Sequence, residues 1–188
     1  MQDKAQAAEA QTATLRRRGG PNESARIKGK YVVKCFDSAG NLKWSDTIDN
    51  VVTTVGKNEM LDTHLAGSAY TASVVMGLKG TGTAVAADTM ASHASWLEVG
   101  GVNAPAYTGN RPAPTFSAAA GGAKATSADV SFTFTSGGTV AGCFITQGGS
   151  ATKDNTTGTL VSAGDFSGGN RTVVATDVLD VSYTLTLT

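Results

Sequence analysis

The last twelve residues, "DVLDVSYTLTLT" (177–188), decide the fold of this chain. From Val181 to Leu187 every second residue is apolar, and the residues between are serine or threonine. In an extended strand, successive side chains point to opposite faces, so the apolar residues share one face and the hydroxyls share the other. The segment therefore predicts a β-strand with one face against a core.

Other segments repeat this pattern. "SADVSFTFTSG" (127–137) alternates in the same way, and "KYVVKCFDSAGNLKWSDTI" (30–48) predicts a hairpin because "DSAGN" supplies turn residues between two strand-like runs. "GTVAGCFITQGG" (138–149) is a continuous apolar run, as expected for a buried strand. Three prolines keep residues 100–114 out of a central strand. Together with 23 glycines, these segments predict a mainly β fold, an antiparallel β-sandwich.

One short helix of about ten residues is predicted within "VVTTVGKNEMLDTHLAGSAY" (51–70). Asn58 is the expected N-cap, and Gly67 falls where such a helix would end. Its apolar side chains should close one end of the sandwich; they are Met60, Leu61 and Leu65.

Composition limits the class of protein. The chain has 188 residues, of which 40% are hydrophobic and 16% charged, and it contains no apolar run near the roughly 20 residues of a membrane-spanning helix. The first twenty residues lack the apolar segment of a signal peptide, so export by that route is not expected. We predict a β-sandwich domain over residues 30–188 and a basic N-terminal arm over residues 1–29.

The predicted arm differs in charge from the predicted domain. Residues 1–30 hold seven basic and three acidic residues, whereas residues 31–188 hold eight and twelve. We take the cations of this region as the partner-binding residues; they are Arg16, Arg17, Arg18, Arg26, Lys28 and Lys30. Nucleic acid would be attracted by them, but no aromatic residues for base stacking lie between them. An acidic protein surface is therefore the favoured partner.

The helix segment also gathers possible acid–base groups. Lys57, Glu59, Asp62 and His64 lie within eight positions and could form a carboxylate–imidazole pair for proton transfer. A zinc-binding helix requires two histidines four residues apart, and the segment does not have them. The solvent-facing side of an amphipathic helix is the favoured interpretation.

The remaining reactive residues give no specific signature. His93 could belong to a serine triad, but no nucleophile motif accompanies it, and a structural place beside Trp96 is favoured. Cys35 and Cys143 could pair, although isolated buried thiols are the favoured interpretation. We expect no cofactor and no metal site.

Several segments together resemble a known group of proteins. They are "NVVTTVGKNEMLDTHLAGSAYT" (50–71), "ADTMASHASWLEV" (87–99), "RPAPTFSAA" (111–119), "TVAGCFITQGG" (139–149), "TTGTLVSAGDFSGG" (156–169) and "DVLDVSYTLTL" (177–187). In this order they resemble small virion structural proteins of tailed bacteriophages, over roughly residues 30–188. The nearest architectural match is a capsid cement or decoration protein, with a jelly-roll-like sandwich.

The resemblance implies a non-enzymatic protein on the capsid exterior, assembled in the host cytoplasm. Its partners would be the major capsid protein or other virion subunits, and it would form a homo-oligomer. Two alternatives stay open. A head-fibre or tail-associated adhesin would bind host glycan on aromatic platforms, for which the candidates are Trp44, Trp96 and Tyr107. An enzyme such as a hydrolase would use His64 or His93.

Overall fold

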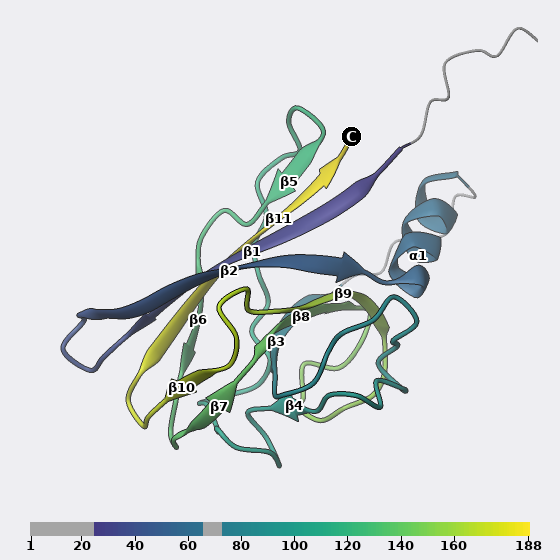
Figure 1. Cartoon of the computed structure of the whole chain (residues 1–188). Helices are drawn as coiled ribbons and strands as arrows, with labels where there is room; N and C mark the ends of the chain where they lie inside the picture. The colour runs from purple at the N-terminus through teal and green to yellow at the C-terminus, as the bar shows by residue number, and fades with distance from the viewer. Residues whose placement is uncertain (1–24, 66–72) are drawn as a thin grey trace, which may run out of the picture.

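The computed structural model describes residues 25–65 and 73–188, and strands dominate both ranges (Figure 1). In chain order the elements are β1 (Ile27–Phe36), β2 (Leu42–Val52), α1 (Thr54–Leu65), β3 (Val74–Lys79), β4 (Glu98–Val99), β5 (Ala123–Ala125), β6 (Val130–Thr133), β7 (Gly138–Val140), β8 (Gly142–Gln147), β9 (Thr159–Asp165), β10 (Arg171–Val173) and β11 (Val178–Leu187). All strand pairings are antiparallel. The predicted mainly β, antiparallel fold is confirmed.

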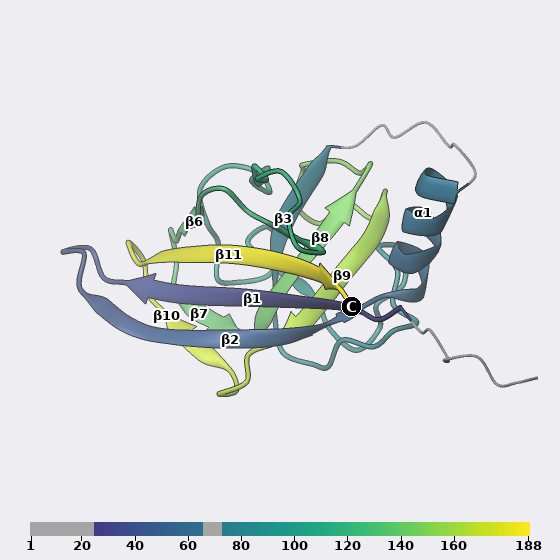
Figure 2. The ribbon, with the colours of Figure 1, turned by 90° about the horizontal axis from the view of Figure 1, so that it is seen from above.

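The strands build two layers that are joined through β2. The large sheet has the order β4-β3-β8-β9-β2-β1-β11-β5, with β6 also paired to β11, while β10 and β7 form a separate two-stranded sheet. The end of β2 pairs with β9 at Val51 and Val52, so β2 passes from one layer to the other. Figure 2 shows the layer of β11, β1 and β2 crossing over β3, β8 and β9 at a steep angle.

The core lies between these layers. It includes Tyr31, Val33 and Cys35 from β1, each fully buried, and Phe132 from β6. The rings of Tyr31 and Tyr183 on β11 lie 4.6 Å apart. Burial of this apolar area, at about 25 cal/mol per Å² removed from water, is the main stabilising contribution of such a core.

The predicted hairpin forms as expected. β1 and β2 are joined at Asp37, whose carboxylate accepts backbone N–H bonds from Ala39 at 2.9 Å and Asn41 at 2.8 Å. Gly40 has a φ of 81°, which a residue without a Cβ adopts at little cost. The turn therefore sets the register of the two long strands.

Two strand boundaries differ from the prediction. Residues 138–149 form two strands in different sheets, because Ala141 leaves the β7 pairing and bonds its N–H to the Lys79 carbonyl at 2.9 Å. β1 begins at Ile27, so residues 27–29 belong to the sheet although they were assigned to the arm.

Helix α1 begins earlier than predicted. The Thr53 hydroxyl accepts the Gly56 N–H at 3.0 Å, so Thr53 is the N-cap, and Asn58, predicted as the cap, lies inside the helix. Gly56 fits because a Cβ there would lie 2.6 Å from the Val161 carbonyl oxygen of β9. The helix thus packs closely against the end of the sandwich (Figure 1).

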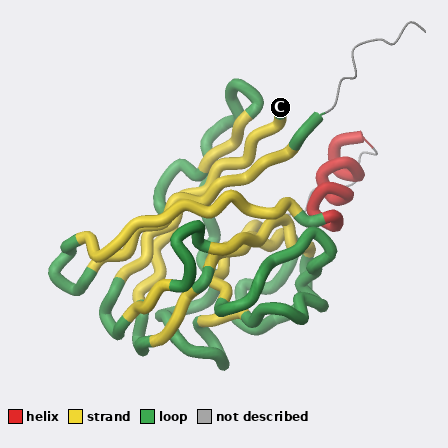
Figure 3. The backbone as a smooth tube through the Cα atoms, viewed as in Figure 1, coloured by secondary structure: helices red, strands yellow, loops and turns green. Residues whose placement is uncertain are grey.

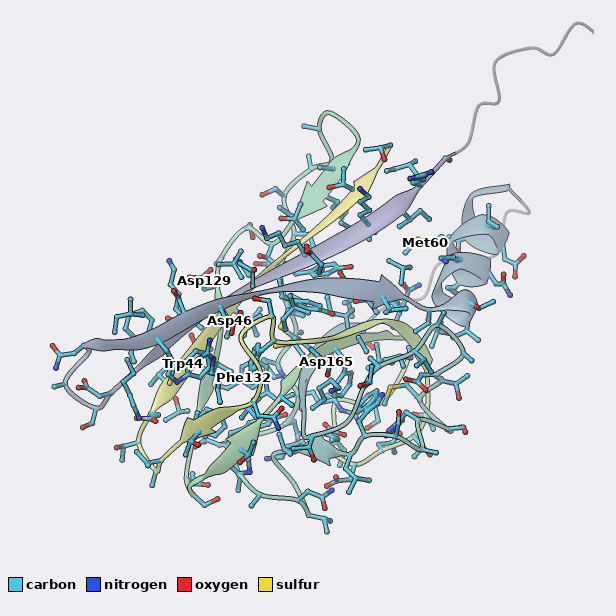
Figure 4. The ribbon with its side chains drawn as sticks, viewed as in Figure 1. Trp44, Asp46, Met60, Asp129, Phe132 and Asp165 are labelled. Atoms are coloured by element: carbon cyan, nitrogen blue, oxygen red, sulfur yellow. The ribbon has the colours of Figure 1, made fainter. Side chains whose placement is uncertain are left out.

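The apolar side of α1 also differs from the prediction. Met60 packs against the core (Figure 4), but Leu61 is 55% exposed, because successive residues of a helix point in different directions. The side chain of Leu65 and residue Gly67 lie outside the described part of the structure.

Within the described residues no helix is long and apolar enough to cross a membrane.

Candidate partner-binding face

The solvent face of β1 carries a row of cations. Arg26, Lys28, Lys30 and Lys34 are all exposed and share one face, because they occupy alternate positions of an extended strand. Arg26 precedes β1, but its carbonyl accepts the Thr188 N–H at 2.9 Å and so extends the pairing with the last strand. We call these four residues the cation row. Successive members are about 6.7 Å apart along the strand, except where Val32 occupies the fourth position.

Hydroxyl side chains lie beside the cation row on β11. The register places Thr186 opposite Lys28 and Thr184 opposite Lys30. Both threonines are half-buried, so the face combines exposed ammonium groups with neutral donors held close to the sheet. Figure 2 looks onto this layer, with β1 between β11 and β2.

Two carboxylates share the face with the cation row. Asp49 on β2 lies opposite Lys30, and Asp180 on β11 lies opposite Lys34 and accepts a hydrogen bond from the Ser131 hydroxyl at 2.6 Å. None of the salt bridges among the described residues includes a cation of the row. The row thus keeps its positive charge available to a partner. This charge is least offset at the Arg26 end, because the two carboxylates lie opposite Lys30 and Lys34.

The Lys34 end of the row adjoins a shallow open depression. Its lining includes Val32, Lys34, Ser45 and Arg171. Arg171 is held there by Asp46, at 2.6 Å between guanidinium and carboxylate. Figure 4 shows Asp46 on β2, close to Trp44.

Asp46 is itself fixed by several donors. Burial raises the pKa of this carboxyl, but hydrogen bonds from Ser167, Arg171 and two backbone N–H groups outweigh burial and bring the pKa below its ordinary value. The Ser167 N–H also donates to the Thr47 carbonyl at 3.1 Å. This loop therefore covers part of the outer edge of β2, which limits pairing with another strand there.

The structure gathers only part of the predicted partner-binding set. Arg26, Lys28 and Lys30 lie together on the cation row, whereas Arg16, Arg17 and Arg18 lie outside the described residues. Lys34 belongs to the row but was not predicted. Its signal was present, since charged and apolar residues alternate from residue 26 to residue 35 except at Gly29 and Val32.

The buried cations elsewhere in the structure are bound by carboxylates and backbone carbonyls of the protein itself. Arg111 is 2% exposed and binds Glu98 through two nitrogens, at 2.8 and 2.6 Å, and it donates further to the Ser150 and Asn155 carbonyls. The Glu98 carboxylate also accepts the Asp154 N–H at 2.8 Å. This cluster holds the loop at 150–158 against β4, and the Arg111 nitrogens donate to groups of the protein.

A second buried cation is used in the same way. Lys79, with no exposed surface, bonds to the Asp165 carboxylate and to the carbonyls of Gly80 and Gly82. Asp165 lies at the end of β9 (Figure 4). Each of the two buried cations, Arg111 and Lys79, thus holds a loop against the sheet.

The proposed aromatic platforms for glycan are mostly inaccessible. Trp96 and Tyr107 are 1% and 3% exposed, so their selection as glycan-binding residues was wrong. Both lie outside the named strands, and long-range contacts with the sheet bury them: Trp96 packs on Phe144, and Tyr107 on Phe132. Trp44 is half-buried, with the Arg171 guanidinium 5.6 Å from its ring.

The histidines and cysteines take structural places where they are described. The His93 ring stacks on the Trp96 ring with their centroids 4.0 Å apart, and its Nδ1 forms a hydrogen bond with the Trp96 carbonyl at 2.9 Å. His93 therefore lies beside Trp96, as predicted. The His64 side chain lies outside the described residues. Cys35 and Cys143 are free and buried, as favoured. Burial raises the pKa of the Cys35 thiol to about 11.

The exposed face of β1 therefore remains as the candidate site. Figure 3 shows that its layer is mostly strand, drawn in yellow, whereas loops gather around β4 and the ends of the other layer. A regular sheet holds its charges at fixed spacing, which suits binding to another surface. No protein-family model, curated protein or solved structure matches this chain.

Proposed function

We propose that this protein is a non-enzymatic virion structural protein, a capsid cement or decoration protein that binds the outer shell and stabilises it. One observation carries the attachment step: the cation row lies exposed on a regular sheet, and its members enter none of the salt bridges among the described residues. The sequence resemblance to tailed-phage virion proteins supports a capsid shell as the assembly to which the row binds.

The physical basis is electrostatic complementarity. Cations that are not paired within the protein attract an acidic surface over about one Debye length, near 8 Å at physiological ionic strength. They speed encounter and fix orientation more than they add affinity. Burial of Val32, which is 36% exposed between Lys30 and Lys34, would add an apolar contact.

Binding to assembled shells tests this proposal. Empty shells made from the major capsid protein of the same genome are mixed with the purified chain and separated by sedimentation. The variant Lys28→Glu with Lys30→Glu should leave most of the protein unbound. Lys57→Glu is the control for a charge reversal elsewhere, because Lys57 is exposed on α1, away from the face. Equal occupancy by the double variant and the control would contradict attachment through the face.

The arm can be separated from the face in the same assay. Deleting residues 1–25 leaves the whole cation row in place while removing Arg16, Arg17 and Arg18. We expect a folded protein that binds shells more weakly than the full chain. Unchanged occupancy would remove the arm from the mechanism.

A further inference from the structure

We propose that the cation row binds a single extended acidic segment of the partner protein, with carboxylates at alternate positions. The inference rests on the proposed function in taking the partner to be a protein of the same assembly. It adds the conformation and the residue pattern of the segment that lies on the face.

The spacing of the row favours an extended partner. Alternate residues of any strand repeat every 6.7 Å or so, hence carboxylates on one side of an extended segment match successive cations of β1 without bending. An acidic helix repeats every 6 Å or so at i and i+4, and its side chains also rotate away from the contact line. The mismatch accumulates from Arg26 to Lys34, so a helix would engage only part of the row.

The composition of the row predicts the pattern of the partner. Three cations stand at successive alternate positions, followed by Val32 and then by Lys34. The matching segment carries acid at three alternate positions, an apolar residue at the fourth and acid at the fifth. The hydroxyls of Thr184 and Thr186, beside Lys30 and Lys28, can donate to the second oxygen of each carboxylate.

The same face is poorly suited to nucleic acid. The side chains that β1 and β11 direct to this face, from residues 26–34 and 180–188, include no aromatic group on which a base could stack. Asp49 and Asp180, beside Lys30 and Lys34, would also weaken the attraction of a chain of phosphates, which carries no apolar group to contact Val32.

Peptide binding to the full chain tests the pattern. The probe is a fluorescent peptide, Asp-Thr-Asp-Thr-Asp-Thr-Val-Thr-Asp, made in both chain directions. A peptide of identical composition with its four aspartates adjacent is the matched control. In fluorescence anisotropy the alternating peptide should bind roughly tenfold more tightly, as expected for three or four exposed ion pairs of about 0.5 kcal/mol each. Lys28→Glu with Lys30→Glu should abolish this preference, and Lys57→Glu should keep it.

Three results would overturn the inference. Equal affinity for the two peptides would show that the face binds negative charge regardless of the spacing of the carboxylates. Tighter binding of a ten-nucleotide oligothymidylate would indicate a nucleic-acid partner. Loss of the preference in Arg16→Ala, Arg17→Ala, Arg18→Ala, with the cation row intact, would move the site to the arm. Circular dichroism melting of each variant checks that the domain is folded.

The two proposals can fail separately. If the alternating peptide shows no preference but Lys28→Glu with Lys30→Glu still releases the protein from shells, the acidic-strand inference is wrong and shell binding stands. If the peptide binds as predicted but the full chain does not bind shells, the proposed function is wrong and the peptide specificity stands.

Discussion

The two faces of β1 differ in chemistry although they alternate residue by residue. Tyr31, Val33 and Cys35 point inward and are fully buried, while Lys28, Lys30 and Lys34 point outward and are exposed. A shift of one position along the strand exchanges a core residue for a binding residue. Stability and attachment are therefore carried by the same strand but by different positions, so they can be changed independently.

Charges in the two regions also behave differently. The interior cations Arg111 and Lys79 are each bound to a carboxylate and to backbone carbonyls, because an unpaired charge removed from water is costly. The cations of the row stay hydrated and need no such partner. The interior cations thus hold loops in place, whereas the cations of the row are available to bind a partner.

The largest effect should come from the buried side of β1. Tyr31→Ala should lower the free energy of unfolding by about 3–5 kcal/mol, because a large cavity forms and the Ser162 hydroxyl, 2.6 Å from the Tyr31 hydroxyl, loses its partner. Lys30→Ala, the neighbour on the other face, should change it by less than about 0.5 kcal/mol. Urea denaturation measures both. Similar losses would show that the two faces are not separable.

Breaking an interior charge pair should have a similar or slightly smaller effect. Arg111→Met leaves the Glu98 carboxylate buried without its cation, which costs about 3–5 kcal/mol in comparable cases. Adding Glu98→Gln should recover part of the loss, because no buried charge remains. Thermal denaturation checks this. A double variant that is no more stable than the single one would indicate that the pair acts mainly through packing.

A partly exposed pair at the edge of the face should have an intermediate, pH-dependent effect. Asp46→Asn should cost about 2 kcal/mol at pH 7, because charged hydrogen bonds are lost. The pKa of Asp46 is lowered in the folded protein, so its contribution is present above the ordinary carboxyl pKa, about 4, and disappears as the pH falls through the folded value. The stability difference should shrink in urea titrations below pH 4; a constant difference would contradict the role of the charge.

The smallest effect is expected from thiol chemistry on the buried side. Burial raises the pKa of Cys35 to about 11 and raises that of Cys143, so little reactive thiolate exists at pH 8. Iodoacetamide should label neither cysteine in the native protein and both in denaturant, as counted by mass spectrometry. Rapid native labelling would show that the inner face of β1 opens readily.

Local alternation predicted the elements that matter most for the face. β6 and β11 have apolar residues at every second position, and β1 has them from Tyr31 to Cys35; in each strand these residues include the buried side chains. The turn at Asp37 was also readable, because its residues favour a tight connection. Such features depend on neighbours in the sequence, so a single chain contains enough information to place them.

Features set by distant contacts were missed. Thr53 caps α1 because its hydroxyl is also held at the Leu160 carbonyl, and Trp96 is buried because Phe144 and Asp88 receive its ring and its Nε1–H. Lys34 was missed for another reason. The predicted boundary between arm and domain, at residue 30, lies inside β1 and separates cations that one strand holds together.

A density map of the assembled particle would show which face of this chain touches the shell. We expect the outer face of β1 to lie against the shell, with Lys28 and Lys30 within about 4 Å of carboxylates on an extended capsid segment. A map in which this face points to solvent, while the layer of β3, β8 and β9 contacts the shell, would contradict this expectation.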